Sequence, residues 1–145
     1  MTIDNPSDTS ASRSGASIDQ VVSGLGSGAL LDGARLLGLF RAAGQWLEQH
    51  VDRINALNVF PVPDGDTGTN MSLTMRAALE EVHGHTYASV SELARVIAHG
   101  ALMGARGNSG VILSQILRGI ARALDDKREV GASDWAAAMQ EGAAT

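Results

Sequence analysis

The sequence predicts an all-α fold, and two observations lead to that prediction. Hydrophobic residues make up 44% of the 145-residue chain while aromatic residues make up only 3%. The core must therefore consist of closely packed aliphatic and small side chains, which favours helices over a β-sandwich. In addition, apolar residues recur at helical spacing along most of the chain, and no segment shows a convincing alternation with a period of two. A chain of this length has room for one domain with its own core.

The first 28 residues differ in composition from the rest. Residues 1–28 are rich in Ser, Gly, Asp and Thr and contain few large apolar residues, which is typical of a flexible tail. The stretch "GLGSGA" at residues 24–29 matches a loose dinucleotide-binding pattern. No strand-like run precedes it and no βαβ alternation follows, so we interpret it as a linker. We therefore expect the folded domain to occupy residues 29–145.

The apolar spacing predicts five helical segments. The first spans residues 29–57, as one long helix or as two separated near Gly44, and it ends before Pro61 because proline cannot continue a helix. Ser89 and Glu92 form a predicted capping box before the third segment. The later helices are expected at residues 68–82, 91–105, 111–126 and 134–145, the last capped by Ser133. This last helix stops without a cap, so we expect a partial domain that is incomplete at its C-terminal end.

The stretch "NVFPVPDGDTGTN", residues 58–70, carries two acids that are separated by one glycine. Asp64 and Asp66 repel each other on such a tight turn unless a cation lies between them. An EF-hand is excluded because the ligand spacing fails, and a Walker-type phosphate loop because the chain has no G-K-[S/T] triad. The two carboxylates, with the side-chain oxygen of Asn58 as a third ligand, suit Mg²⁺, which substrate phosphates commonly complete. The sequence therefore predicts a magnesium site here.

The residues after the acids suit an anion. Four small or polar residues lead into the next predicted helix, namely Thr67, Gly68, Thr69 and Asn70. Their free backbone N–H groups, their hydroxyls and the helix dipole would accept a phosphate group. The alternative is structural: the stretch could be a Pro/Asp/Gly turn in which Asp66 or Thr67 only caps the helix.

A second glycine-rich loop, "GARGNSG" at residues 104–110, also precedes a helix. Its open backbone offers a second anion site. The candidate residues are Gly104, Ala105, Arg106, Gly107, Asn108 and Ser109. Two alternatives stay open. The glycines could simply let two helices pack closely, with Ser109 as an N-cap, and Arg106 could form a surface salt bridge instead of neutralising charge in phosphoryl transfer.

Two motifs make the sequence recognisable. "LNVFPVPDGDTGTNM" (residues 57–71) and "GALMGARGNSGVILSQILRG" (residues 100–119) closely resemble the nucleotide-binding domain of the dihydroxyacetone kinase L-subunit family, in particular its fatty-acid kinase branch. The resemblance implies a barrel of antiparallel amphipathic helices that carries ATP and two Mg²⁺ ions at one end. It also implies that Asp64 and Asp66 are the catalytic metal ligands. Thr67 and Asn70 would approach the phosphates, and residues 104–109 would cradle them, with side-chain contacts from Asn108 and Ser109.

The chain departs from the dihydroxyacetone kinase branch at two positions. That branch has a third aspartate where this chain has Asn58, and a histidine where this chain has Thr67. These differences fit the fatty-acid kinase branch and lower the negative charge of the site. The resemblance also implies that the domain continues for some tens of residues beyond Thr145.

These features predict an ATP- and Mg²⁺-dependent kinase domain that transfers the γ-phosphoryl group to an acceptor held by a partner protein of the fatty-acid-binding type. A fatty acid giving an acyl phosphate fits the branch, because a carboxylate acceptor needs no general base. Dihydroxyacetone is the close alternative acceptor. The alternatives from other classes are a nucleotide-binding regulatory module without turnover and a structural helical bundle without a ligand.

Composition narrows the partners and the location. The net charge of −5 and the lack of a Lys/Arg cluster argue against nucleic acid. The absence of cysteine excludes disulfides and thiol chemistry. No apolar run approaches the roughly 20 residues needed to span a bilayer, and the N-terminus lacks a signal-peptide pattern, so we expect a cytoplasmic protein. A homodimer formed through regions beyond this chain stays open.

Overall fold

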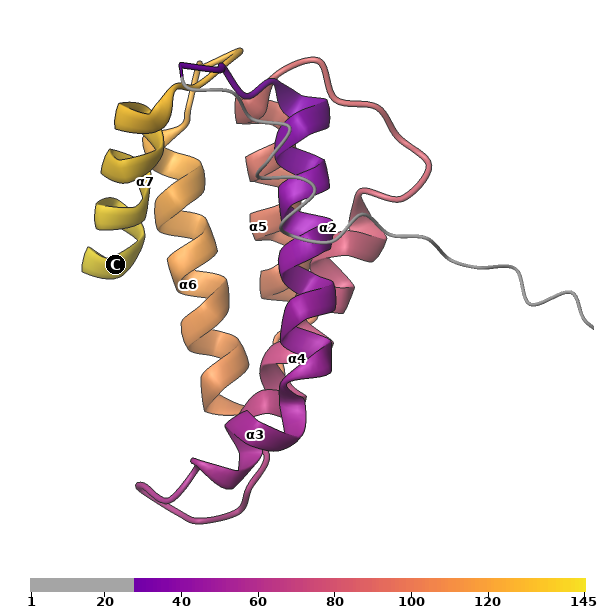
Figure 1. The fold of residues 1–145 in the computed structure, drawn as a ribbon, viewed down its shortest axis with the longest axis vertical. Helices are drawn as coiled ribbons and strands as arrows, with labels where there is room; N and C mark the ends of the chain where they lie inside the picture. The colour runs from indigo at the N-terminus through magenta and orange to yellow at the C-terminus, as the bar shows by residue number, and fades with distance from the viewer. Residues whose placement is uncertain (1–27) are drawn as a thin grey trace, which may run out of the picture.

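A computed structural model describes residues 28–145 of the chain, and these residues form a bundle of six helices (Figure 1). The helices are α2 (Gly33–Gln49), α3 (Val51–Ala56), α4 (Thr67–Glu81), α5 (Val90–Met103), α6 (Gly107–Ala123) and α7 (Ala132–Ala144). The all-α prediction is confirmed: in the described part of the chain, the strand-like pairing is limited to one isolated bridge between Leu31 and Val130. The predicted tail and most of the "GLGSGA" stretch lie outside the described residues.

The first predicted segment divides at a different place from the one expected. The separation near Gly44 was wrong, because the helical path breaks at His50, between α2 and α3. Gly44 instead lies inside α2, where a Cβ atom would lie 2.9 Å from Leu79 Cδ1 on α4. The glycine thus lets α2 approach α4 closely. The helix also begins later than expected, because the Asp32 carboxylate accepts a hydrogen bond from the Arg35 N–H at 2.9 Å and caps α2 there.

The starts of the later helices confirm one predicted cap and correct two boundaries. Ser89 caps α5 as expected, since its hydroxyl accepts a hydrogen bond from the Glu92 N–H at 3.1 Å. Helix α6 begins at Gly107, four residues before the expected start, so most of the second glycine-rich loop is helical. Ser133 does not cap α7. Gly131 occupies that position, and its N–H donates to the Asp134 carboxylate at 3.0 Å.

The core lies between α2, α4, α5 and α6. The largest fully buried side chains are aliphatic and include Leu36, Leu93, Ile97 and Leu124. An edge-to-face contact between Phe40 and Trp135, with ring centroids 6.4 Å apart, joins α2 to α7. Trp46 lies outside this core: it is 51% exposed, and its ring stacks on His50.

The two ends of the bundle differ in their connections (Figure 1). At one end, backbone hydrogen bonds join Leu31 to Val130, and Val90 and Ser91 donate to the carbonyl groups of Arg128 and Lys127. The other end carries α3, the segment that leads into α4, and the start of α6. There, α6 follows α5 through Gly104, where a Cβ atom would lie 2.1 Å from Ala77 Cβ on α4. This close approach brings the beginning of α6 beside α4.

Candidate functional site

Both chemistry-bearing motifs line one cleft of about 480 Å³ at the α3 end of the bundle. Its walls come from the segment before α4, from the first turn of α4, and from the first turns of α6. The lining residues are Asn58, Phe60, Pro61, Val62, Asp64, Asp66, Thr67, Asn70, Gly107, Asn108, Ser109 and Ile112. Of the candidate residues, Gly68, Thr69, Gly104, Ala105 and Arg106 do not line the cleft. Segments about forty residues apart in the sequence therefore meet around one space.

The acidic turn is closed by Asn58. Its side-chain oxygen accepts a hydrogen bond from the Asp66 N–H at 3.2 Å, and its amide nitrogen donates to the Val62 carbonyl at 3.3 Å. Gly65, between the two acids, adopts a φ of 65°, a conformation that glycine adopts without steric cost. These contacts hold Asp64 and Asp66 on one tight turn at the cleft.

Asp66 is the residue before α4, but its side chain makes no capping hydrogen bond. Asn55 on α3 supplies the cap instead. Its Oδ1 accepts from the N–H groups of Gly68 at 2.7 Å and Thr69 at 3.2 Å, and its amide nitrogen donates to the Thr69 hydroxyl at 3.0 Å. The structural alternative, in which Asp66 or Thr67 only caps the helix, is therefore not what the chain adopts, because neither side chain makes a capping hydrogen bond. Both carboxylates also lie outside the ion pairs of the described residues.

The same contacts correct the first predicted anion site. We expected the N–H groups from Thr67 to Asn70 to be free, but those of Gly68 and Thr69 bind Asn55, and that of Asn70 donates to the Asp66 carbonyl at 2.9 Å. Sequence reasoning missed Asn55. Its partners Gly68 and Thr69 lie thirteen and fourteen positions further along the chain, so no pattern around Asn55 indicates this role.

The start of α6 remains open to an anion. No side chain caps this helix, and the Gly110 N–H is the first to donate back into the turn, to the Arg106 carbonyl at 3.0 Å. The N–H groups of Gly107, Asn108 and Ser109 precede it and have no intrahelical acceptor. All three residues line the cleft, so the positive end of the α6 dipole faces the same space as the acids.

Side chains of α4 fix the start of α6 in place. The hydroxyl of Thr74, which is fully buried, accepts from the Arg106 N–H at 3.1 Å and donates to the Asn70 carbonyl at 2.8 Å. The Ser109 hydroxyl donates to the Thr67 carbonyl at 3.5 Å and so links the two motifs. The role of Thr74 is a second contact that the sequence did not indicate.

The glycines of the second loop also serve close packing, as the structural alternative for that loop anticipated. A Cβ atom on Gly110 would lie 2.3 Å from the Thr74 hydroxyl oxygen, and one on Gly107 would lie 2.4 Å from the Asn70 amide nitrogen. Gly107 in addition has a φ of 59°. Packing and an open backbone are thus compatible here. The cap and the salt bridge named with those alternatives are absent in the described residues, since Ser109 does not cap α6 and Arg106 forms no ion pair there.

The donor set suits a hard cation. Asp64 and Asp66 are the charged side chains of the cleft, and oxygen ligands are what Mg²⁺ prefers. Within residues 28–145, no three His, Cys, Asp or Glu side chains gather in one place. A cation held by the two acids would therefore take further oxygen ligands from Asn58, from water or from a bound anion.

Comparison with known proteins agrees with the two motifs. The family model described as "DAK2 domain" matches residues 61–145. Protein YloV of Bacillus subtilis (strain 168) is 46% identical over 112 residues, which cover 77% of this chain and 20% of that protein. An uncharacterized protein of Staphylococcus haemolyticus (strain JCSC1435) is 43% identical over 115 residues, which cover 79% of this chain and 21% of that protein. The chain thus spans about one fifth of the length of these relatives. Within the described residues, no helix has the length and apolar character that crossing a membrane requires.

Proposed function

This chain belongs to the DAK2 domain family, and from that premise we propose that its cleft binds Mg-ATP and supports transfer of the γ-phosphoryl group. The family carries a kinase-associated, ATP-binding role. One observation supports the proposal most directly. The carboxylates of Asp64 and Asp66, which form no ion pair among the described residues, line the same cleft as the uncapped N-terminus of α6. A cation and a polyphosphate would therefore find complementary charges there.

We assign different tasks to the two walls. Asp64 and Asp66 hold one or two Mg²⁺ ions. The N–H groups of Gly107, Asn108 and Ser109 hold phosphate oxygens, while Thr67 and Asn70 flank them from α4. Gly68 and Thr69 support the site indirectly, because their N–H groups bind Asn55. Bound Mg²⁺ withdraws charge from the phosphoryl oxygens, which is its usual contribution to phosphoryl transfer.

The cleft offers positioning and charge neutralisation, which supply most of the catalysis in phosphoryl transfer. An acceptor oxygen forms a bond to the γ-phosphorus, the bond to the bridging oxygen breaks, and ADP leaves. The cleft is lined by no histidine or lysine among the described residues. A carboxylate acceptor is already ionised and needs no base, so we propose a fatty acid, held by a partner protein, that becomes an acyl phosphate. Dihydroxyacetone is the alternative acceptor.

The test is a thermal-shift and calorimetric titration of the 145-residue chain with Mg-ATP. Ligand at 100 times its dissociation constant should raise the free energy of unfolding by about 2.7 kcal/mol. A folded chain that shows no shift with Mg-ATP or Mg-ADP would refute nucleotide binding. Binding without transfer to a fatty acid or to dihydroxyacetone, with the partner protein present, would leave a regulatory nucleotide-binding module.

A further inference from the structure

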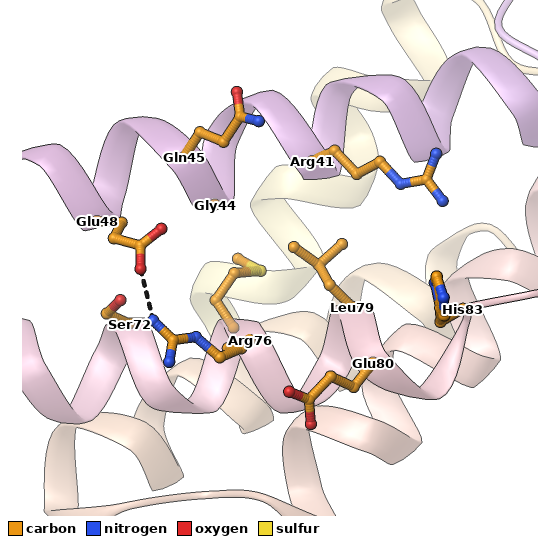
Figure 2. Close-up of a pocket in the computed structure, with 10 residues that line it drawn as sticks. Arg41, Gly44, Gln45, Glu48, Ser72, Arg76, Leu79, Glu80 and His83 are labelled. Atoms are coloured by element: carbon orange, nitrogen blue, oxygen red, sulfur yellow. Dashed lines mark hydrogen bonds and ion pairs between the residues drawn. The ribbon is translucent and has the colours of Figure 1, made fainter. Parts of the chain in front are cut away.

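A second hollow lies between α2 and α4 and shares no residue with the cleft. It is a groove of about 430 Å³ (Figure 2). Its lining residues are Arg41, Gly44, Gln45, Glu48, Ser72, Met75, Arg76, Leu79, Glu80 and His83. None of these side chains has a role in the proposed function of the cleft, so the groove needs a separate explanation.

The floor of the groove is apolar. Met75 and Leu79 of α4 lie beside Gly44 of α2: a Cβ atom on Gly44 would be 2.9 Å from Leu79 Cδ1 and 3.4 Å from Met75 Cγ. Met75 is 8% exposed and belongs to the core, while Leu79 is partly buried against it. A ligand in the groove would thus contact hydrocarbon and sulfur.

The two ends of the groove differ in charge. At one end, Glu48 and Arg76 form an ion pair across the groove and neutralise each other (Figure 2). Arg41 and His83 lie at the other end, one from each wall, and neither forms an ion pair with a described residue. The nearest acid in the lining, Glu80, directs its carboxylate away from α2 in this view. One end therefore holds a compensated ion pair, and the other holds an arginine without an ion-pair partner among the described residues.

We propose that this groove binds a small amphipathic anion, with an apolar body on Met75 and Leu79 and a carboxylate or phosphate head at Arg41. Small-molecule sites have volumes of about 300–1,000 Å³ and are mostly apolar with a few placed polar groups, and this groove has both properties. The planar guanidinium of Arg41 suits either head group. From Arg76 to His83 the helical rise gives a length of about 10 Å, which suits a medium-length alkyl chain.

The test uses the methyl group of Met75 as a probe in the 145-residue chain. The chain is labelled with ¹³C at its methionine methyl groups and titrated with decanoate, with decyl phosphate and with uncharged decanol. We expect a saturable shift of the Met75 signal with the two anions, and the stronger of them identifies the head group. Decanol should bind at least about tenfold more weakly, because a hydrogen bond to a charged group contributes about 1.5–3 kcal/mol.

Matched variants test the position of the head group. Arg41→Gln should weaken binding of the anion about tenfold and leave decanol unchanged. Arg118→Gln is the control, since it removes an arginine of α6 that lies outside the groove and has no ion pair among the described residues. Equal binding of decanol and decanoate would overturn the proposal. So would an unchanged affinity in Arg41→Gln, or the absence of a Met75 shift up to about 1 mM anion.

The same spectra separate this proposal from two others. A Met75 shift that grows with protein concentration in the absence of any ligand would assign the groove to a second copy of the chain and overturn the proposal. Loss of Mg-ATP binding in Asp64→Asn bears on the cleft and leaves the groove unaffected, so the two sites are judged independently.

Discussion

Asn55 caps a helix to which it does not belong: its side-chain oxygen lies 2.7 Å from the backbone nitrogen of Gly68. The contact joins α3 to the first turn of α4, directly after the acidic turn. A Cβ atom on Gly68 would lie 2.6 Å from the Val51 carbonyl oxygen, so the two helices touch without an intervening side chain. The position of Asp66 at the cleft therefore depends on α3 as well as on its own helix.

Replacing Asn55 should separate the two parts of this contact. Asn55→Ala removes the acceptor for two N–H groups and should lower the free energy of unfolding by about 1–2 kcal/mol. Asn55→Asp keeps the acceptor, loses the amide donor to the Thr69 hydroxyl, and adds a negative charge that the N-terminus of α4 stabilises, so it should cost less. Urea denaturation measures both variants. Identical midpoints for wild type and Asn55→Ala would show that the cap contributes nothing.

Neutralising the acids should affect binding and stability in opposite directions. Asp64→Asn or Asp66→Asn removes a magnesium ligand, so for a tenfold loss of affinity the stabilisation by Mg-ATP falls from about 2.7 to about 1.4 kcal/mol at the same ligand concentration. Without Mg²⁺, the same variants should be at least as stable as wild type, because the like charges no longer repel.

Calorimetry with Mg-ATP and melting without it provide the two measurements for the acids. Asp52→Asn, at an acid of α3 that does not line the cleft, is the control and should leave ligand binding unchanged. Unaltered Mg-ATP affinity in both cleft variants would contradict the proposed metal site.

Gly107 and Gly38 have opposite surroundings, so alanine substitutions at these two positions form a matched pair of variants. Gly107→Ala forces a side chain into a φ of 59° and against the Asn70 amide, so it should lower the free energy of unfolding by about 1–3 kcal/mol. Gly38 lies inside α2 with no atom near a new methyl group. Gly38→Ala should therefore raise the free energy of unfolding by up to about 1 kcal/mol. Thermal melting measures the stability of both variants. Equal effects would show that the positive φ of Gly107 carries no strain.

The turn before α7 should make stability dependent on pH. The Gly131 N–H, which donates to the carboxylate, and Lys127, which pairs with it, hold the pKa of Asp134 below its ordinary value of 3.8. A lowered pKa means that the folded state releases this proton more readily, so the contribution is present above pH 3.8 and is lost as the pH falls through the lowered value.

Asp134→Asn should therefore be less stable than wild type at neutral pH, and the difference should shrink as the pH falls below 3.8. Urea midpoints at a series of pH values measure it. Glu129→Gln, at an acid of the same connection without an ion pair among the described residues, is the control. A difference that stays constant across the acid range would contradict the role of the carboxylate.

Sequence reasoning succeeded where the signal is local. Apolar spacing gives the all-α class, and Ser89 with Glu92 gives the start of α5. The grouping of both motifs around one cleft agrees with the resemblance that the motifs suggested. Proline placed the end of the first helical segment, because its ring excludes helix continuation whatever its surroundings.

The missed features depend on contacts between distant segments. Asn55 acts on Gly68 across thirteen positions and Thr74 acts on Arg106 across thirty-two, so neither can be inferred from its neighbours in the sequence. Gly44 is a further case: a glycine inside an apolar pattern suggests a break, and only the neighbouring Leu79 shows that it serves packing. At each of these positions, a tertiary contact outweighs the local conformational preference of the sequence.

Both walls of the cleft are held by one helix, α4. The acidic turn runs straight into α4, and the start of α6 is bound to α4 through Thr74, Asn70 and Thr67. Within the described residues, the spacing between the walls is thus set by contacts along one helix, α4. A nucleotide would meet a receptor that is assembled beforehand and would lose little entropy to domain closure on arrival. Its association rate should accordingly be governed by diffusion and charge, with no slow conformational gate.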